Sequence, residues 1–486
     1  MRRSRLILLL LFAAGVLTAI ATLRGGEYDE FYTVFLLAGD PRPVWPTRPF
    51  TPSQVRADFI GKAGFANIAR HLRRGDVHPP FYFWLAKLWR SAFGPALLTL
   101  RLFSVLCALI ALLLLARIAA ALGIDPPSAL LLTLGCYGFA YSSIVARDFA
   151  LTTALILGAL LTLLRRAPTP RSDFCAGALL ASACCTNDLA VFTVLTLWLW
   201  LACQSRSRLW PVSFGAVPLV PLWAWFYLAQ RNSRQGQFHH FTITRALAAL
   251  IRDQAAALLG GLPDYAPRAL MLPAEVALGG FLLLLGVMAL RAHLPVRGKT
   301  LLIAGAVAPP LGLLMLGAAF DCMPFEIRYF WLGIPFIGLL LAAGLAPFPR
   351  LRTLLLALDF AALIGLAVAP QTMQPGARLA VRSGRMNAQT LIIIPFGNDG
   401  VGIPGPFINA SPPSATILVA RQANAALLAR ARAYPRVALP DLTPDHASRI
   451  LRPHLLDLFQ ASLCWAEAPG PHRVTIFLNH CQVSHG

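Results

Sequence analysis

The sequence predicts an all-α polytopic membrane protein that ends in a small α/β domain. Hydrophobic residues make up 57% of the 486 residues, and the mean hydropathy is +0.64. Charged residues account for only 13% of the chain, about half the share of an average soluble domain. Apolar runs close to the roughly 20 residues that cross a bilayer recur up to residue 370. Beyond it, short strand-like and helix-like runs replace them.

The net charge of +21 does not indicate nucleic-acid binding. Lys62, Lys87 and Lys299 are the only lysines, so nearly all of the positive charge is arginine. Much of it falls in short loops between apolar runs, where positive charge keeps a loop in the cytoplasm. Some of the rest lies near the other membrane surface, where anionic lipid phosphates are natural partners. We therefore expect membrane lipids, and not nucleic acid, as partners.

The apolar runs predict about eleven transmembrane helices, and at most about thirteen. The first follows the basic start of the chain and is expected to stay uncleaved; a signal peptide is the alternative, because Ala19-Ile20-Ala21 resembles a cleavage site. The expected spans are 6–23, 96–116, 128–146, 149–164, 174–187, 189–203, 209–229, 273–290, 300–320, 329–346 and 351–370.

The charges at the span ends support this alternation. With the N-terminus inside, every inner loop is basic, as the positive-inside rule requires. The inner residues are Arg117, Arg165, Arg166, Arg171, Arg206, Arg208, Arg291, Arg297, Lys299, Arg350 and Arg352. The outer ends carry most of the acidic residues near a span: Glu27, Asp29, Glu30, Asp148, Asp188, Asp321 and Glu326.

Three segments outside the spans have their own character. The first outer loop covers 24–95, and its stretch 81–95 is aromatic and charged, as in a helix at the membrane surface. In the long outer loop 230–272, the stretch 244–259 is amphipathic. We therefore expect a membrane domain at 1–370 and an extracytoplasmic α/β domain at 371–486.

The C-terminal domain shows strand and helix patterns but no cofactor fingerprint. Strands are expected at 390–395, 415–419 and 473–479, and helices at 421–433 and 444–461. The glycine-rich stretch 397–402 lacks the dinucleotide-binding spacing and favours a plain loop. Two alternatives are open for Cys464 and Cys481: a disulfide if the domain lies outside the cytoplasm, or free thiols.

Asp29 and Glu30 are the leading candidates for chemistry. Neighbouring residues on a helix point about 100° apart, so one would face a substrate while the other braces or binds elsewhere. The alternative is a solvated helix start, where carboxylates favour the N-terminal dipole.

Other candidates collect on the same outer side. His78 precedes Pro79-Pro80 and could bind phosphate, donate a hydrogen bond or ligate a metal, or simply belong to a rigid turn. Arg147-Asp148 interrupts an apolar run, as a self-satisfied ion pair or as a phosphate ligand. Arg328-Tyr329 offers the same choice, and Asn187-Asp188 marks a helix junction. Arg101, within the second span, can extend to the same surface.

These motifs, in this order, resemble the family 39 glycosyltransferases. The match consists of an acidic pair after the first span, His78-Pro79-Pro80-Phe81-Tyr82, an arginine in the second span, the stretch 146–151 around Arg147, and Arg328-Tyr329. The family includes protein mannosyltransferases and lipid A aminoarabinose transferases, and it belongs to the C-type superfamily of membrane enzymes. The resemblance covers about residues 1–345.

The resemblance implies transfer of one sugar, hexosyl or pentosyl, from a polyprenyl-phosphate donor to an acceptor hydroxyl outside the cytoplasm. The family's catalytic acid corresponds to Asp29, with Glu30 beside it, and its arginine motif corresponds to Arg147. Here Phe149 follows where the family usually has a tyrosine, so that part of the pocket departs from the family. An inverting transfer needs a general base, for which Asp29 is expected. His78, Arg147, Arg328 and Tyr329 are expected to bind the donor phosphate.

Other readings remain open at the level of the sequence. The acceptor can be a protein, a lipid or a glycan, and a lipid or glycolipid transporter is the alternative function. A transporter should carry polar residues near the middle of several spans, whereas these charges gather at one face. No cofactor is required, although Glu30 and His78 could hold a divalent metal ion. The expected location is a bacterial inner membrane, with the active site on the periplasmic face.

Overall fold

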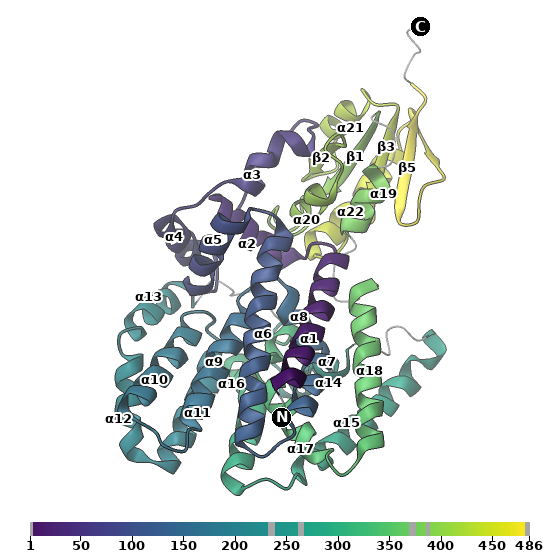
Figure 1. Cartoon of the computed structure of the whole chain (residues 1–486). Coiled ribbons are helices and arrows are strands. Elements are labelled where there is room, and N and C mark those ends of the chain that lie inside the picture. Colours follow the sequence, from purple (N-terminus) through teal and green to yellow (C-terminus); the bar gives the residue numbers. More distant parts are fainter. Residues whose placement is uncertain (1–2, 232–238, 261–266, 369–375, 385–388, 482–486) are drawn as a thin grey trace. The chain divides into compact units, whose positions relative to one another are not determined.

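The computed structural model describes residues 3–231, 239–260, 267–368, 376–384 and 389–481. The chain forms two compact units (Figure 1). The first contains 1–23, 69–89 and 98–371, and the second contains 24–68, 90–97 and 372–486. Helices α4 (Phe65–Gly75) and α5 (Phe81–Phe93) run from one unit into the other. The helix expected near 81–95 is therefore present as α5.

The first unit is built mainly from apolar helices at the places where the sequence predicts spans, and it also contains α14 (Ile243–Leu259) and η3 (Arg268–Leu270) from the expected outer loop 230–272. The other helices are α1 (Arg3–Leu23), α6 (Leu97–Ala121), α7 (Pro126–Gly135), α8 (Tyr137–Ile144), α9 (Phe149–Leu163), α10 (Pro170–Cys184), α11 (Ala190–Gln204), α12 (Arg206–Ala216), α13 (Val220–Gln230), α15 (Met271–Leu290), α16 (Val296–Phe320), η4 (Ile327–Phe330), α17 (Ile334–Gly344) and α18 (Pro349–Val368).

The sequence predicts eleven spans, but fewer helices than that are long enough to cross a bilayer singly. Five qualify by length and composition among the described residues, namely α1, α6, α15, α16 and α18. Two bent pairs raise the number to seven: α8 with α9, at 112°, and α12 with α13, at 67°. The expected span 128–146 divides at Cys136 into α7 and α8. Its uniformly apolar sequence does not predict this interruption.

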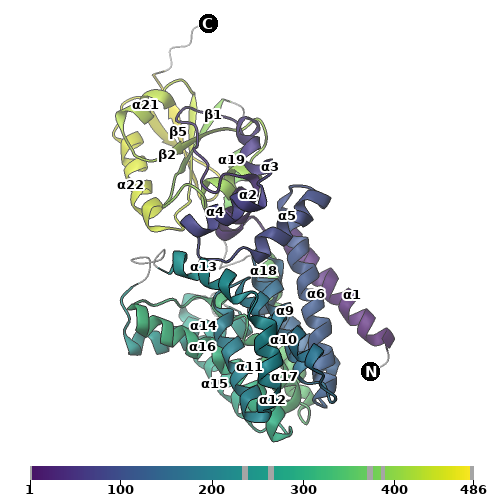
Figure 2. The same ribbon diagram turned by 90° about the vertical axis from the view of Figure 1, so that its left-hand side faces the viewer.

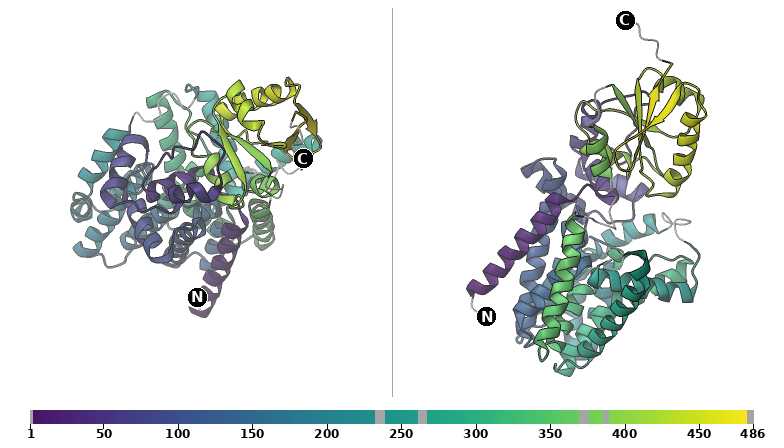
Figure 3. Two further views of the ribbon diagram at one scale, coloured as in Figure 1. Left: turned by 90° about the horizontal axis from the view of Figure 1, so that it is seen from above. Right: turned by 90° about the vertical axis from the view of Figure 1, so that its right-hand side faces the viewer.

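Helices distant in sequence pack together within the first unit. Helix α1 lies beside α18 (Figures 1 and 3), and the rings of Phe12 and Phe360 are 5.9 Å apart. Helices α10 and α12 approach so closely that a Cβ at Gly177 would collide with the backbone of Val212. Small residues allow such close contact between membrane helices.

The second unit contains a five-stranded sheet in the order β2-β1-β3-β5-β4. Strand β1 (Thr390–Pro395) pairs in parallel with β2 (Thr416–Ala420) and β3 (Arg436–Pro440), while β5 (Val474–Asn479) is antiparallel to β3 and to β4 (Trp465–Ala468). Helices α21 (Ala425–Ala431) and α22 (His446–Gln460) cover one face of the sheet (Figure 2). Helices α19 (Gly376–Gly384) and α20 (Pro404–Ala410) complete the domain.

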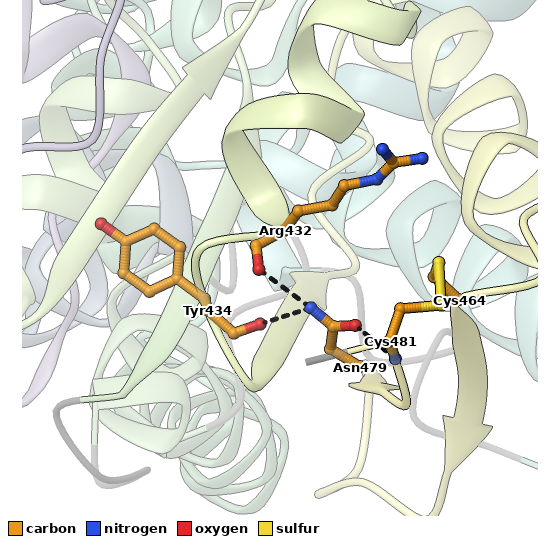
Figure 4. Close-up of a disulfide and its surroundings, with 5 residues drawn as sticks. All are labelled: Arg432, Tyr434, Cys464, Asn479 and Cys481. Carbon is orange, nitrogen blue, oxygen red and sulfur yellow. Dashed lines mark hydrogen bonds between the residues drawn. A yellow bond between two sulfur atoms is a disulfide. The ribbon is translucent and has the colours of Figure 1, made fainter. Parts of the chain in front are cut away.

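The α/β class expected for this region is confirmed, with two strands more than the sequence showed. Strands β3 and β4 are short, and neither has a run of β-branched residues long enough to stand out. Cys464 and Cys481 form a disulfide that fastens the chain after β5 to the start of β4 (Figure 4). The expected domain boundary at 370/371 lies outside the described residues.

Most of the first outer loop folds with this sheet. Its elements are α2 (Tyr28–Ala38), η1 (Pro52–Val55) and α3 (Arg56–Ile60). Phe50 makes an antiparallel bridge to Ile417 of β2, with backbone hydrogen bonds of 2.9 and 2.8 Å. No local pattern grouped 24–68 and 90–97 with the C-terminal sheet, because the bridge between Phe50 and Ile417 joins segments far apart in the chain.

Candidate functional site

Asp29 and Glu30 lie in the first turn of α2, and the structure distinguishes between them. Glu30 is fully buried, and its carboxylate accepts a 2.9 Å hydrogen bond from the backbone N–H of Glu27, the residue that precedes the helix. The Glu27 side chain in turn faces the backbone N–H of Glu30, and this reciprocal capping box stabilises the start of the helix. Asp29 remains partly exposed. Of the two carboxylates, Asp29 is therefore the more accessible to solvent.

His78 lies in the first unit, between an acid and an arginine. Its Nδ1 is 2.8 Å from Oδ1 of Asp76, and a guanidinium nitrogen of Arg147 is 3.1 Å from Nδ1 and 3.3 Å from Nε2. His78 and Arg147 are only 7% and 4% exposed. Two of the expected phosphate ligands thus come together, although 69 residues separate them.

The hydrogen bonds and charges around His78 act on the carboxylate of Asp76. An Nδ1–H of His78 can donate to Asp76, and the Arg147 guanidinium lies against the same ring. Burial opposes ionisation of Asp76, but the hydrogen bond from His78 and the charges of His78 and Arg147 outweigh it and lower the pKa of Asp76 below its usual range. Asp76 is therefore a fixed negative charge at neutral pH.

Arg147 is placed by the break between α8 and α9. The chain leaves α8 at Val145 in an extended conformation and bends by 112° before α9. At the break, the Val145 carbonyl accepts 2.7 Å hydrogen bonds from Ser104 of α6 and from the Arg147 N–H, which take the place of a helical partner. Non-helical backbone at this depth is tolerated where protein surrounds it. The break directs Arg147 toward His78 instead of into a continuous helix.

A second break, between α10 and α11, faces the first. Asn187 donates to Oδ2 of Asp148 at 3.0 Å, and this oxygen lies 3.8 Å from Nε2 of His78. Trp223 of α13 donates to Asp188 at 2.8 Å. Burial raises the pKa of Asp188 to about 7, although the hydrogen bond from Trp223 and the charge of His78 counteract it. The expected helix junction at Asn187-Asp188 is present and joins the His78 cluster.

The loop that carries His78 is fixed by backbone contacts. Gln230 donates to the His78 carbonyl at 3.1 Å, and the Phe81 N–H donates to the Cys185 carbonyl at 3.2 Å. An apolar cavity of about 300 Å³ lies among α10, α11, α12 and α13, and Trp223 forms part of its wall. The polar cluster and this apolar cavity therefore adjoin at Trp223.

Arg328 and Tyr329 form their own pair in η4. Arg328 makes a 2.5 Å ion pair with Glu326, and its guanidinium lies 5.4 Å from the ring centre of Tyr329. Shortly after them, Trp331 donates to the Phe149 carbonyl at 3.1 Å, and the two rings are 4.9 Å apart. The segment of Arg328 is thus packed against the helix that follows Arg147.

Some expectations receive no support from the geometry. Arg101 is buried and donates to the Ala21 carbonyl in the last turn of α1 at 2.7 Å, so it contacts protein and is not exposed to solvent. A metal at His78 does not fit, because Asp76 and Arg147 engage its ring nitrogens and a guanidinium would repel a cation. Within the described part of the chain, no group of three or more His, Cys, Asp or Glu is arranged to hold a metal ion.

The sequence missed the partners that complete the cluster. Asp76 stands two residues before His78, a spacing within reach of a turn hydrogen bond, and so had a local signal. The pairing of Asn187 with Asp148 and of Trp223 with Asp188 had none, because tertiary packing creates both.

Comparison with known proteins identifies the fold. No family model matches the sequence, and no curated protein matches it. Among solved structures, ArnT from Cupriavidus metallidurans bound to undecaprenyl phosphate is similar, with a TM-score of 0.54, 12% identity and coverage of 99% of both chains. Its apo state gives the same TM-score and identity over 98% of this chain and 97% of that one.

A third match is the arabinofuranosyltransferase AftD from Mycobacteria, with a TM-score of 0.43 and 16% identity over 97% of this chain and 41% of that one. The likeness to ArnT extends from one end of both chains to the other, so it includes the C-terminal domain as well as the membrane helices. The chain therefore has the fold of ArnT, and the expected architecture of membrane helices with a small C-terminal α/β domain is confirmed.

Proposed function

We propose that the protein is a membrane glycosyltransferase that moves a single sugar from a polyprenyl-phosphate donor to an acceptor hydroxyl. The observation that carries the proposal is the ArnT fold over 99% of both chains, in a neighbour solved with undecaprenyl phosphate. The buried cluster of His78 and Arg147 at a helix break adds a polar site where the bilayer would otherwise demand apolar residues.

Asp29 supplies the general base in this proposal. It accepts the proton of the acceptor hydroxyl as that oxygen attacks the anomeric carbon, and the bond from this carbon to the phosphate oxygen breaks. Attack opposite the leaving group inverts the anomeric configuration. The partial exposure of Asp29, beside a fully buried Glu30 that braces the helix start, favours this division of roles.

The leaving polyprenyl phosphate needs positive charge rather than a proton donor. Arg147 and Arg328 offer fixed guanidinium groups, which match phosphate oxygens in pairs. His78 and Tyr329 offer hydrogen bonds. The phosphate would compete with Asp76 for Arg147 and His78, so donor binding would rearrange their present contacts. The apolar cavity beside Trp223 suits a prenyl chain.

The proposed location is a bacterial inner membrane, with the active site on the periplasmic face. The basic loops on one side and the acidic span ends on the other support this orientation. The disulfide between Cys464 and Cys481 is typical of an oxidising compartment. The proposed membrane domain lies within 1–370 and the proposed extracytoplasmic domain is 371–486, with 24–68 and 90–97 of the first loop folded onto the latter. The acceptor class is a protein, a lipid or a glycan.

A transfer assay in nanodiscs tests the proposal. A panel of polyprenyl-phosphate sugars is offered to the wild type, to Asp29→Asn and to Asp457→Asn, a control at an exposed carboxylate of α22. Release of polyprenyl phosphate by the wild type and the control, lost in Asp29→Asn, is the expected result. If no donor is consumed while labelled lipid crosses the bilayer of proteoliposomes, the transporter function replaces the transferase.

A further inference from the structure

The helix that carries Asp29 is tied to one carboxylate of the C-terminal domain. Tyr28 and Tyr32 are four residues apart, so their side chains share one face of α2. The Tyr28 hydroxyl donates to Oδ1 of Asp399 at 3.2 Å, and the Tyr32 hydroxyl donates to Oδ2 of the same residue. Asp399 thus holds two hydroxyls from the helical turn that contains Asp29.

The turn around Asp399 is itself fixed. Gly397 and Gly400 adopt φ values of 73° and 75°, which favour glycine, and place Asp399 at the tip between them. Oδ1 of Asp399 also accepts from the Val401 N–H at 3.0 Å. The Asn398 N–H donates to Asp445, the N-cap of α22, at 2.8 Å. A rigid turn, and not a flexible loop, therefore presents the carboxylate.

Helix α2 lies directly on this part of the domain. A Cβ at Gly402 would collide with the Tyr28 ring, and one at Gly405 would lie 2.8 Å from the ring of Phe31. Trp45, further along the first loop, donates to the Gly400 carbonyl at 2.6 Å. Both glycines are thus needed for the close approach, and an apolar contact accompanies the hydrogen bonds.

The helix needs such support because it is short. It has 11 residues, and isolated helices of fewer than about 12–15 residues are marginal in water. At its other end, the buried Arg90 donates to the Val34 carbonyl at 3.2 Å, where a cation favours the C-terminal dipole. Asp29 points about 100° away from Tyr28, so the same contacts that anchor the tyrosines fix its direction.

We propose that Asp399 is a positioning residue, which orients Asp29 through Tyr28 and Tyr32 and gives the C-terminal domain a direct part in the transfer. This inference rests on the proposed function, in which Asp29 is the base. Burial and the charge of Asp399 raise the pKa of both tyrosines above the usual range, so their hydroxyls stay protonated and donate.

The test uses the full-length protein in nanodiscs and compares Asp399→Asn with Asp457→Asn. The asparagine keeps the size of the side chain but cannot accept both hydroxyls on two oxygens. We expect kcat of Asp399→Asn to fall by up to about a hundredfold, because misplacing a reacting group by about 1 Å can lower the rate by that factor. The KM for the donor should be unchanged. Hydrogen exchange should rise in residues 28–38 and stay at the wild-type level in α22.

A double-mutant cycle makes the pairing specific. Tyr28→Phe with Tyr32→Phe should reproduce the loss of kcat, and adding Asp399→Asn should lower kcat no further, because the three side chains act as one unit. Wild-type kcat in Asp399→Asn would overturn the inference. So would a loss of kcat accompanied by faster exchange throughout the second unit, which would show a folding defect.

The same assay separates this inference from the proposed function. If Asp29→Asn keeps the wild-type rate, or if no donor is consumed by the wild type, the proposed function fails and the inference falls with it. If Asp29→Asn is inactive while Asp399→Asn matches Asp457→Asn, the transferase assignment stands and the positioning role alone is refuted.

Discussion

His78 is held between opposite charges, and this decides what it can do. Asp76 occupies one side of the imidazole and Arg147 lies against both ring nitrogens. Asp148, whose Oδ2 is 3.8 Å away, adds a second negative charge. Two carboxylates and one guanidinium thus surround the imidazole, and in the proposed function Arg147 is the group that a phosphate would draw away. Arg147 is therefore the residue whose removal tests the phosphate site.

We expect Arg147→Ala to lower kcat/KM for donor cleavage by about a hundred- to a thousandfold, the usual cost of losing one group that stabilises developing charge. Arg147→Lys should restore only part of the loss, because a point charge cannot match two phosphate oxygens. Steady-state kinetics with varied donor measure both. The control is Arg297→Ala, at an exposed arginine of α16, and equal activity of the two alanine variants would contradict the assignment.

Asp188 predicts a dependence of stability on pH. Its pKa is about 7 in the folded chain and about 4 when unfolded. Between these values the unfolded chain has lost the proton that the folded chain retains, so rising pH favours unfolding. Asp188→Asn cannot ionise, so its unfolding temperature relative to wild type should increase from pH 5 to pH 8. Thermal unfolding of both proteins from pH 5 to pH 8 measures this difference in unfolding temperature. A difference that stays constant with pH would refute the raised pKa of Asp188.

At the scale of elements, breaks in helices create the site. The bend between α8 and α9 places Arg147, and the turn between α10 and α11 places Asn187 and Asp188. In the other unit, α2 is short and depends on its glycine-rich support. Two broken helix pairs and one short helix thus carry the candidate site residues.

Gly402→Ala should disturb α2 specifically. The added Cβ would collide with the Tyr28 ring, and overpacking costs about 1–3 kcal/mol, so Tyr28 and its helix should shift. We expect the transfer rate to fall about tenfold or more and the apparent unfolding temperature to drop. Gly279→Ala in α15 is the matched control, since no atom lies within 4 Å of that Cβ. A wild-type rate in Gly402→Ala would show that α2 tolerates displacement.

The sequence predicted the elements better than their breaks and pairings. Apolar length located the long helices of the first unit, because burial in lipid leaves a strong composition signal, while aromatic or amphipathic character located α5 and α14. The interruption at Cys136 and strands β3 and β4 were missed, since tertiary contacts rather than local propensity decide them. Arg147 and His78 were expected on one side of the membrane, but nothing local indicated that they touch. Nothing in the local sequence indicated the hydrogen bond from Tyr32 to Asp399 either.

At the scale of the whole molecule, segments from the N-terminal part of the chain pack against segments from the C-terminal part within each unit. Helix α18 packs beside α1 within the first unit. Within the second, the loop after the first helix adds Phe50 to the edge of the C-terminal sheet. The tail is closed by the disulfide, next to which Asn479 donates to the carbonyls of Arg432 and Tyr434 at 3.0 and 3.2 Å (Figure 4). Long-range closure of this kind makes the C-terminal domain sensitive to reduction.

Replacing Cys464 and Cys481 together with serine should therefore destabilise this domain by about 3 kcal/mol, the chain-entropy cost for a loop of this length. The two cysteines are 17 residues apart. Limited proteolysis of the membrane-embedded protein should cut the tail faster in the double variant, and reductant should reproduce the effect in the wild type. Cys203→Ser, at an exposed free thiol, should change neither; identical cleavage of all three proteins would argue against the bridge.

Single-turnover cleavage of a labelled polyprenyl-phosphate sugar tests the central claim most directly. The wild type should release free polyprenyl phosphate, Asp29→Asn should bind the donor without cleaving it, and Arg147→Ala should bind it weakly. That pattern would establish a base and a separate phosphate site acting on one lipid-linked donor. Release at the wild-type rate by Asp29→Asn, or binding of donor by Arg147→Ala as tightly as by the wild type, would contradict the account.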